Sequence, residues 1–502
     1  MIILNKKQLY ASKFIENFIN SENDFMILLG PGGSGKTTVV SDSLKNLNKS
    51  VCFCAFTNKA TKVLSDKSNK IRCLDSKTIH KLLKLEPEIV EYKIKTKGKN
   101  NVIKTALNYK YSLQKQKYLV KYDIIVFDEC STITNTLFDQ IMSTYNFLLN
   151  KKNHTLKYIF LGDFWQLPPV NENSSIVFKT AIKNKWPLIK LNKVMRSGNK
   201  RMETINDNLL DCIKQIKENP KNIRNIFENF PHNIIKNVKN KVYINDYSRF
   251  INKYFKLIKK RPNTVFITYS NKNCDNINKI IQEMRLSKNK QTSVNFDITN
   301  KYKENDRIMI NNMVYKSEWV KKNETIEMYR PNINDNNEEY LYNGEIYIVR
   351  KVQKIKVISN LNITNLKSIP EYFNAELLTL ESLSNNNLVK TVYINDKELE
   401  ECKRILRCNL KKSEYKNQIS QFRKIFPILK YGYCMTIYKA QGSEFDCVLL
   451  NLASFYWSFK SKKQIASTKS EKSNKGWRKL LFKAIYSAAT RAKRKLYVYS
   501  SS

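Results

Sequence analysis

The sequence predicts an α/β protein built on parallel sheets, with a β-rich insertion in its second half. Four short apolar runs carry this prediction, at residues 25–29, 51–56, 122–127 and 158–161. Apolar residues fill these runs almost without a break, as in strands that are buried on both faces. The first run leads through a glycine-rich turn into a stretch of helical periodicity, so strand and helix alternate as in an α/β fold.

The first run is followed by a phosphate-binding loop. GPGGSGKTT occupies residues 30–38, and its first eight residues fit the pattern GxxxxGK[ST]. Glycines let backbone N–H groups curl around phosphate oxygens, and the helix N-terminus that follows adds a favourable dipole. Lys36 would reach the β- and γ-phosphates, and the Thr37 hydroxyl would bind Mg²⁺. The predicted cofactors are ATP and Mg²⁺, and the predicted binding residues of this loop are Gly30, Gly32, Gly33, Ser34, Gly35, Lys36, Thr37 and Thr38.

Two later strand ends supply candidate catalytic groups. Asp128 and Glu129 follow the run at 122–127, at the strand end where open α/β sheets bind ligands. Asp128 would hold Mg²⁺, and Glu129 would polarise the attacking water. Gln166 lies in the loop GDFWQLPPV after the run at 158–161, placed to reach a γ-phosphate or that water. An acidic pair or a proline turn is by itself ordinary surface, but the phosphate loop upstream favours catalytic roles.

Charge and composition limit the class of partner. The formal net charge is +45 and the pI is about 9.7, which favours a polyanionic partner through counterion release. The sequence is also rich in Lys, Asn and Ile, and Lys far outnumbers Arg. An A+T-rich genome produces the same skew, with the extra Lys as ordinary solvated surface. Charge alone therefore leaves both interpretations open.

Cysteine and apolar patterning bear on compartment. The ten Cys form no CxxC pair and the chain has three His, so no zinc or iron–sulfur site is expected. Cys52 and Cys54 alternate along an expected strand and are interpreted as small core residues. No apolar stretch approaches the ~20 residues that span a membrane. We expect a soluble intracellular protein, cytoplasmic or nuclear, with a virus among its candidate sources.

The motif order resembles superfamily 1 DNA helicases of the RecD/Dda-like branch (superfamily 1B). The quoted stretches are NKKQLYA (Q-motif), GPGGSGKTT (motif I), FTNKATKVL (Ia), SKTIHKLL (Ib), DECS (II), GDFWQLPPV (III), LNKVMRS (IV), MTIYKAQGSEFD (V) and IYSAATRAKRKLYVY (VI). They run from residue 5 to residue 499, so the resemblance covers nearly the whole chain and no separate accessory domain is expected. TIHKLL, QLPPV and YKAQGSEFD favour this branch over the UvrD/Rep-like one.

The resemblance implies two RecA-like P-loop domains in tandem with ATP in the cleft between them. Gln8 would recognise adenine, Glu444 would contact the ribose, and Arg196 and Arg491 would be arginine fingers from the second domain. A guanidinium group bridges phosphoryl oxygens in a bidentate way that Lys cannot, although each Arg alone also suits a surface ion pair. Ser487-Ala488 replaces the family's usual Val-Ala pair, which we interpret as a small packing change.

The resemblance also sets the expected domain limits. Domain 1 would span 1–195, with a β-hairpin pin element inserted at about 86–121, and domain 2 would combine 196–290 with 431–502. Residues 291–430 would form a mainly β, SH3-like module, because runs such as EIYIVRKV alternate with turn residues. A degenerate linker is the alternative there. Tyr92, Tyr109 and Tyr111 of the pin are candidates to touch bases, or else ordinary surface.

The predicted activity is that of an ATP-dependent DNA helicase moving 5′→3′, with the direction taken from the resemblance alone. Its partners would be single-stranded and forked DNA, with no membrane, and it would act as a monomer. The candidate strand contacts are Phe56, Thr57, Asn58, His80, Thr436 and Lys439. Two alternatives stay open: an RNA helicase of superfamily 1, and a basic nucleic-acid-binding protein that uses ATP as a switch without unwinding. The motifs do not report the 2′-OH contact that separates RNA from DNA.

Overall fold

The computed structural model forms two compact units. The first comprises Met1–Pro87, Tyr109–Cys274 and Met435–Ser502, and the second comprises Glu88–Asn108 and Asp275–Cys434. The structure describes residues 4–500 apart from residues 46, 56–60, 62–73, 97–98, 151–155, 171, 196–199, 220–242, 245, 290–300, 313, 316–318, 323–324, 329–338, 342, 359–371, 384–385, 412–413, 416–417, 420–421, 424–425 and 459–471.

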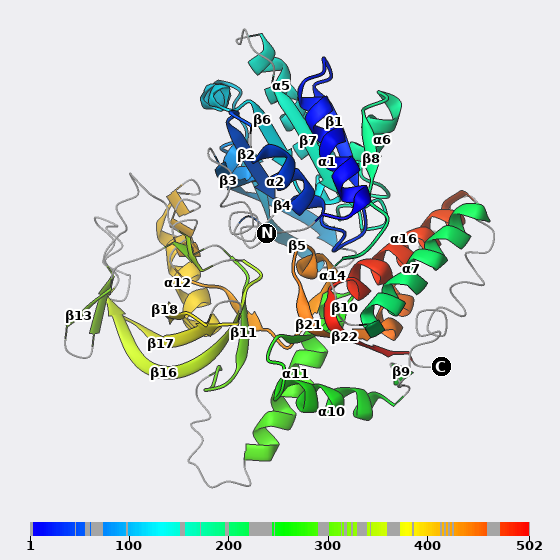
Figure 1. The fold of residues 1–502 in the computed structure, drawn as a ribbon. Helices are drawn as coiled ribbons and strands as arrows, with labels where there is room; N and C mark the ends of the chain where they lie inside the picture. Colours follow the sequence, from blue (N-terminus) through cyan, green and yellow to red (C-terminus); the bar gives the residue numbers. More distant parts are fainter. Residues whose placement is uncertain are drawn as a thin grey trace. The chain divides into compact units, whose positions relative to one another are not determined.

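The first unit contains a six-stranded parallel sheet (Figure 1). Its order is β3 (Leu74–Thr78), β2 (Val51–Ala55), β6 (Ile124–Phe127), β7 (Lys157–Gly162), β1 (Phe25–Leu29) and β8 (Leu188–Lys190). Every neighbouring pair is parallel. The predicted α/β class is thereby confirmed. Because β7 lies between β6 and β1, the loops that follow these three strands leave the sheet side by side.

Alternating side chains give this sheet two apolar faces. Met26 and Leu28 face one core together with α1 (Lys6–Ile19) and α2 (Lys36–Leu44). Ile27 and Leu29 face the other core. That second core also holds residues of η1 (Gln114–Lys121), α5 (Asn135–Leu149), α6 (Ile176–Lys183) and the one-turn helix α4 (Ile79–Leu82). Cys52 and Cys54 are fully buried here, as their spacing predicts.

The same unit holds a second sheet. Its order is β20 (Cys434–Thr436), β10 (Thr264–Thr268), β21 (Phe445–Asn451), β22 (Ala492–Tyr499) and β9 (Tyr243–Ile244). The pairs β10–β21, β21–β22 and β22–β9 are parallel. The accompanying helices are α7 (Lys200–Glu218), α10 (Tyr247–Ile258), α14 (Ile437–Ala440) and α16 (Lys472–Ala489), all visible around β10, β21 and β22 in Figure 1. Two parallel sheets in one chain are what tandem P-loop-type domains require.

The second unit is mainly β, as predicted for the insertion. Its largest sheet runs β13 (Trp319–Lys322), β14 (Thr325–Met328), β16 (Ile346–Ile358), β11 (Arg307–Ile310) and β19 (Leu429–Tyr431), with β17 (Tyr372–Ser382) joining β16 to β18 (Leu388–Tyr393). A small sheet pairs β12 (Val314–Tyr315) with β15 (Glu339–Leu341), and the helices are α11 (Asn271–Asn289), which begins in the first unit, and α12 (Asp396–Asn409). This sheet has its own core around Tyr302 and Tyr347, so a degenerate linker is the wrong description.

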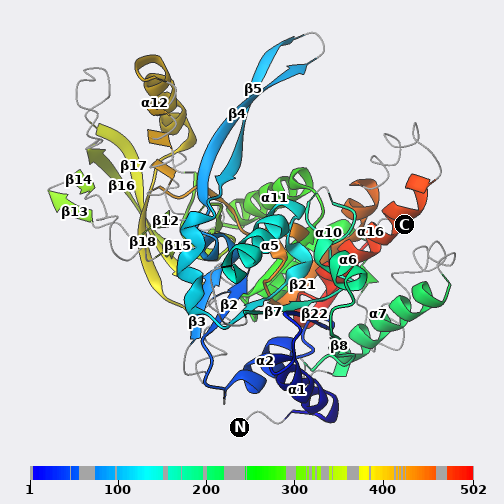
Figure 2. The ribbon, with the colours of Figure 1, turned by 90° about the horizontal axis from the view of Figure 1, so that it is seen from above.

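A long two-stranded hairpin, β4 (Glu86–Thr96) and β5 (Lys99–Lys110), occupies the expected pin segment and is prominent in Figure 2. Among the residues that the structure describes, no helix is long and apolar enough to cross a membrane.

Phe160 tests how strongly the first sheet depends on its aromatic core. Its ring is fully buried in β7 and stacks on Phe127 at 5.0 Å and on Trp186 at 5.4 Å between centroids. Truncation to Ala removes these contacts and leaves a cavity, so Phe160→Ala should lower the free energy of unfolding by about 3–5 kcal/mol. Urea denaturation followed by fluorescence measures the loss. Ile182→Ala, at a position that is 68% exposed on α6, is the control and should change stability by less than about 0.5 kcal/mol.

Candidate nucleotide site

The loop after β1 has the backbone shape of a phosphate cradle. Gly33 and Gly35 both adopt positive φ, at 81° and 84°, a conformation that glycine reaches without the steric cost of a Cβ atom. A Cβ on Gly35 would also come within 2.6 Å of Gln8 Nε2. Ser34 Oγ is buried and has no hydrogen-bond partner. A buried hydroxyl without a partner inside a glycine-rich loop fits a site made for an anion.

Lys36 and Thr37 begin α2 at the end of this loop. Lys36 Nζ donates to the carbonyl oxygens of Gly30 at 2.8 Å and Pro31 at 3.2 Å. Thr37 Oγ1 donates to Asp128 Oδ2 at 3.1 Å. A hydroxyl and a carboxylate at this spacing are the hard oxygen donors that Mg²⁺ prefers, with phosphate and water completing its octahedron. These two residues therefore fit the predicted metal.

The acidic pair after β6 is held by its own backbone. Glu129 has a left-handed backbone with φ 51°, and its N–H donates to Asp128 Oδ1 at 2.8 Å. Burial raises the pKa of the Asp128 carboxyl, and the neighbouring Glu129 carboxylate raises it further. The Lys36 ammonium group, the Glu129 N–H and the Thr37 hydroxyl act in the opposite direction on that pKa. A bound divalent cation would favour the ionised form in the same way.

Arg491, just after α16, reaches the acidic pair from the second sheet. Its side chain is 3% exposed, and Nη1 lies 3.9 Å from Glu129 Oε1. A Cβ added to Gly32 of the phosphate loop would stand 3.5 Å from Arg491 Nη2. Gln166 lies between the two charged groups. With its amide nitrogen toward Glu129 Oε2 (2.9 Å) and its oxygen toward Arg491 Nη2 (3.2 Å), both contacts are hydrogen bonds, and the network assigns this orientation.

The loop after β7 is fastened to α16 and α14 at several points that the sequence analysis missed. Ser487 Oγ accepts from Leu167 N at 2.9 Å, and Tyr486 Oη donates to Asp163 Oδ2 at 2.9 Å. Gln441 Nε2 donates to Leu167 O at 3.3 Å. The Ser487 substitution is thus more than a packing change, because its hydroxyl makes a buried hydrogen bond. The signal available in the sequence was a hydroxyl side chain among the apolar residues Ala484, Ile485, Ala488 and Ala489.

Lys483 is a second group that the sequence analysis missed. It is 4% exposed on α16, with its ammonium group 4.7 Å from the centre of the Phe164 ring. Burial lowers its pKa to about 8, and the nearby Lys479 lowers it further while Asp163 opposes the shift. Burial also raises the pKa of Asp163, which Lys36 and the Trp165 N–H act against.

Two nucleotide contacts predicted from the resemblance already have partners. Gln8 Oε1 accepts from Asn5 N at 3.0 Å and Gln8 Nε2 donates to Ser34 O at 3.1 Å, so Gln8 supports the phosphate loop directly. Glu444 Oε2 lies 3.5 Å from Lys493 Nζ. Its neighbour Ser443 accepts from Arg491 Nη1 at 3.5 Å. The adenine and ribose roles of Gln8 and Glu444 stay predictions. Arg196 lies outside the described residues.

The predicted strand contacts fall into three groups. Phe56, Thr57 and Asn58 lie outside the described residues, as does the side chain of Tyr92. His80 packs against Tyr109 with ring centroids 4.7 Å apart, and burial lowers the His80 pKa. The Tyr111 hydroxyl is bonded to Thr144 Oγ1 at 2.6 Å and Gln140 O at 3.0 Å, which gives it a structural role.

Thr436 and Lys439, the third group, belong to a pattern that occurs twice. Thr78 ends the edge strand β3 and is the N-cap of α4, and Thr436 ends the edge strand β20 and is the N-cap of α14. The sequences there are TIHK (78–81) and TIYK (436–439). Each sheet therefore presents the same short motif at one edge.

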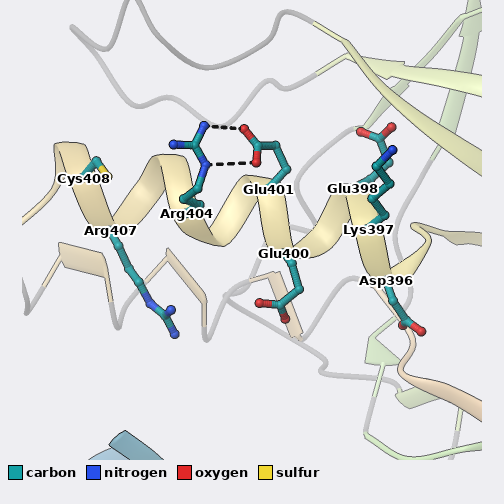
Figure 3. Close-up of a pocket in the computed structure, with 8 residues that line it drawn as sticks. All are labelled: Asp396, Lys397, Glu398, Glu400, Glu401, Arg404, Arg407 and Cys408. Carbon is teal, nitrogen blue, oxygen red and sulfur yellow. Dashed lines mark hydrogen bonds and ion pairs between the residues drawn. The ribbon is translucent and has the colours of Figure 1, made fainter. Parts of the chain in front are cut away.

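A separate hollow lies on α12 in the second unit (Figure 3). Charged residues of both signs line it, and several are paired along the helix, as Arg404 is with Glu401 at 2.6 Å. It shares no residue with the site around Lys36. Surface pairs of this kind contribute little energy and do not make a binding site.

The fold and this site define a P-loop nucleotide-binding protein of the α/β class. Residues 16–172 match the family model described as an AAA domain. This match covers the phosphate loop, the acidic pair and Gln166, and it supports the resemblance of the motif order to superfamily 1 helicases.

Proteins similar to this chain include two uncharacterized proteins and one helicase of known structure. An uncharacterized protein of Acanthamoeba polyphaga mimivirus is 26% identical over 503 residues, covering 89% of this chain and 93% of that protein. An uncharacterized protein of Methanocaldococcus jannaschii is 28% identical over 218 residues, covering 41% of this chain and 17% of that protein. The crystal structure of the Pif1 helicase from Candida albicans is 14% identical with a TM-score of 0.47, covering 100% of this chain and 95% of that one. At that TM-score the superposition assigns no activity.

Lys483 makes stability depend on pH in a defined window. Its pKa is about 8 in the folded protein against 10.5 for the free side chain, so burial of its charge costs stability below pH 8. That cost disappears as the pH rises toward 10.5. Lys483→Met should therefore be more stable than wild type near neutral pH, by on the order of 3 kcal/mol, and the difference should shrink by pH ~10.

Urea denaturation of both proteins at several pH values between neutral and ~10 measures this difference. Lys179→Met, on the exposed side of α6, is the control and should differ little from wild type at each pH. A stability difference between wild type and Lys483→Met that does not change with pH would contradict the assignment.

Proposed function

We propose that this chain is an ATP-dependent DNA helicase that couples ATP hydrolysis to 5′→3′ movement on single-stranded DNA and to duplex unwinding. The observation that carries the proposal is the position of Arg491. It follows a helix that packs with the second sheet, yet its guanidinium group lies 3.9 Å from Glu129 at the edge of the first sheet. Hydrolysis at Glu129 would therefore depend on the position of the second sheet, which carries Arg491.

The hydrolytic roles follow from the contacts. Lys36 would exchange its two carbonyl partners for the β- and γ-phosphates. Thr37 and Asp128 would hold Mg²⁺, which when bound offsets charge on the phosphate oxygens. Glu129 would orient the attacking water. Gln166 contacts both Glu129 and Arg491, so its position would couple the presence of the γ-phosphate to these two residues. Arg491 would stabilise the charge that develops on the transferred phosphoryl group.

The repeated TIHK and TIYK motifs support a strand-binding track. They end equivalent edge strands, so a phosphate backbone lying across both sheets would meet Thr78 and His80 on one and Thr436 and Lys439 on the other. Hydroxyl and amide groups bind phosphates without reading sequence. His80 would contribute hydrogen bonding rather than charge, because burial lowers its pKa. The net charge of +45 favours the same class of partner. DNA and the direction of movement come from the resemblance alone.

Arg491→Ala tests whether the second sheet takes part in hydrolysis. The substitution removes the guanidinium group but leaves the phosphate loop, so nucleotide binding should persist while kcat falls about 10³-fold. Steady-state ATPase assays and binding of a fluorescent ADP analogue measure the two effects. Arg494→Ala is the matched control, because that arginine is 59% exposed and paired with Asp446.

Lys36→Ala checks the phosphate loop in the same assays. It should abolish turnover, whereas Lys45→Ala at the C-cap of the same helix, where the side chain is 40% exposed, should not. Full ATPase activity in Lys36→Ala would remove the loop from the site. An unchanged kcat in Arg491→Ala would remove Arg491 from the catalytic groups.

A strand-displacement assay with tailed duplexes tests the motor and its direction. We expect ATPase activity stimulated by any single-stranded DNA, with steep salt dependence, and unwinding of duplexes that carry 5′ tails. The same duplexes with 3′ tails, and RNA versions of both, are the controls. Unwinding of 3′-tailed DNA alone would refute the direction, and RNA-only stimulation would favour an RNA helicase. ATP turnover without displacement of any duplex would leave a nucleic-acid-binding switch.

A further inference from the structure

Ser487 is bonded on one side to the loop that carries Gln166 and on the other to Arg491. We propose that Ser487 is a positioning residue that fixes the spacing between Gln166 and Arg491 for hydrolysis. The proposal rests on the ATPase activity proposed above. Ser487 itself does not touch the nucleotide, so its effect on the reaction passes through these two residues.

The two ends of Ser487 have different partners. Its side-chain Oγ accepts a hydrogen bond from Leu167 N at 2.9 Å, one residue beyond Gln166. Its carbonyl oxygen accepts from Arg491 Nε at 3.2 Å, four residues further on and just after the end of α16. The residue is 1% exposed, so water does not compete for either bond. A single residue thus connects the loop that follows β7 of the first sheet with the guanidinium group that comes from the second sheet.

The surrounding contacts hold the loop but do not make this connection. Tyr486 bonds Asp163, and Gln441 bonds Leu167 O. Trp165 packs edge-on against Phe482 with ring centroids 5.6 Å apart. These contacts keep the loop on α16 when one bond is lost. Removal of the Ser487 hydroxyl should therefore displace Gln166 locally without separating the two elements.

Loss of the hydroxyl has a defined physical cost. A methyl group cannot accept a hydrogen bond, so Ser487→Ala leaves the Leu167 N–H buried and unpaired. The loop then moves to find another partner, and Gln166 moves with it. Displacements of about 1 Å in a catalytic constellation reduce rates by up to about 10²-fold. Threonine keeps the hydroxyl at the same position and should restore the bond.

The kinetic test compares Ser487→Ala with Ser487→Thr. Ser487→Ala should lower kcat for ATP by about 10-fold or more while KM changes by less than about 3-fold, because binding energy is not lost. Ser487→Thr should recover most of kcat. Thermal melting of each protein checks its folding. Equal kcat in wild type and Ser487→Ala would overturn the proposal, whether or not KM rises in the variant.

A double-mutant cycle separates positioning from a general structural effect. If the Ser487 hydroxyl acts through Gln166, then Ser487→Ala added to Gln166→Ala should lower the residual kcat no further than Gln166→Ala alone. Full additivity of the two losses would show that Ser487 acts elsewhere and would overturn the proposal. The cycle needs only the alanine variants, so it decides even where the extra methyl group of Ser487→Thr is not accommodated.

Hydrogen–deuterium exchange tests the contact independently of turnover. The peptide covering residues 162–170 should exchange faster in Ser487→Ala than in wild type, because the Leu167 amide loses its partner. Unchanged exchange in this peptide would overturn the proposal even in an active enzyme. The failure of the proposed function would look different. If wild type hydrolysed no ATP, and the peptide still exchanged faster in Ser487→Ala, the hydrogen bond would be established. The proposed function and the catalytic role of Ser487 would both be refuted.

Discussion

The buried guanidinium group of Arg491 is the constraint on which the nucleotide site depends. A charge with almost no access to water must be surrounded by acceptors, or its desolvation would be prohibitive. Those acceptors are the carbonyl oxygens of Ser487 and Ser443 and the side chains of Glu129 and Gln166. Two of them come from the first sheet. The contacts that compensate the Arg491 charge therefore join the carboxyl edge of the first sheet to α16, which packs with the second sheet.

Sheet order explains why the first-sheet partners are available together. The strands β6, β7 and β1 are adjacent, and in parallel strands their carboxyl ends meet at one edge. The acidic pair, the Gln166 loop and the phosphate loop therefore start next to one another at this edge of the sheet, although they are far apart in sequence. Gly162 lets the start of the Gln166 loop lie close to the segment after the acidic pair, because a Cβ there would stand 2.5 Å from Cys130 Sγ.

The sequence predicted four strands of the first sheet and the glycine-rich loop between β1 and α2, since these depend on local pattern. Continuous apolar runs marked β1, β2, β6 and β7 to within about two residues at each end, and the glycine spacing marked the phosphate loop. The Thr37–Asp128 contact follows from motif order as well. These features are set by residues close in sequence or by the general rule that places ligands at strand ends.

What the sequence did not predict is set by contacts between distant segments. The Ser487-Ala488 pair was interpreted as a small packing change, because no local pattern reveals that the Ser487 hydroxyl accepts from a backbone N–H 320 residues away. Lysine is common in this chain, so nothing in the sequence singled out Lys483, and only its burial against Phe164 distinguishes it. Tyr111 resembled an exposed aromatic residue, but its hydroxyl is fixed to α5. Burial and long-range pairing, rather than propensity, separate these residues from their neighbours.

The two carbonyl oxygens that hold the Lys36 ammonium group have a consequence for how tightly a nucleotide is retained. When a phosphate binds, the ammonium group must give up its hydrogen bonds to Gly30 O and Pro31 O. Part of the energy of each new hydrogen bond therefore only replaces the energy of one that is lost. The net gain from each such bond is smaller than for an ammonium group that had no partner before the phosphate bound. When the phosphate leaves, the lysine has internal partners waiting and no unpaired buried charge is created. For the proposed ATPase, the loop itself would thus favour departure of the spent nucleotide after each turnover.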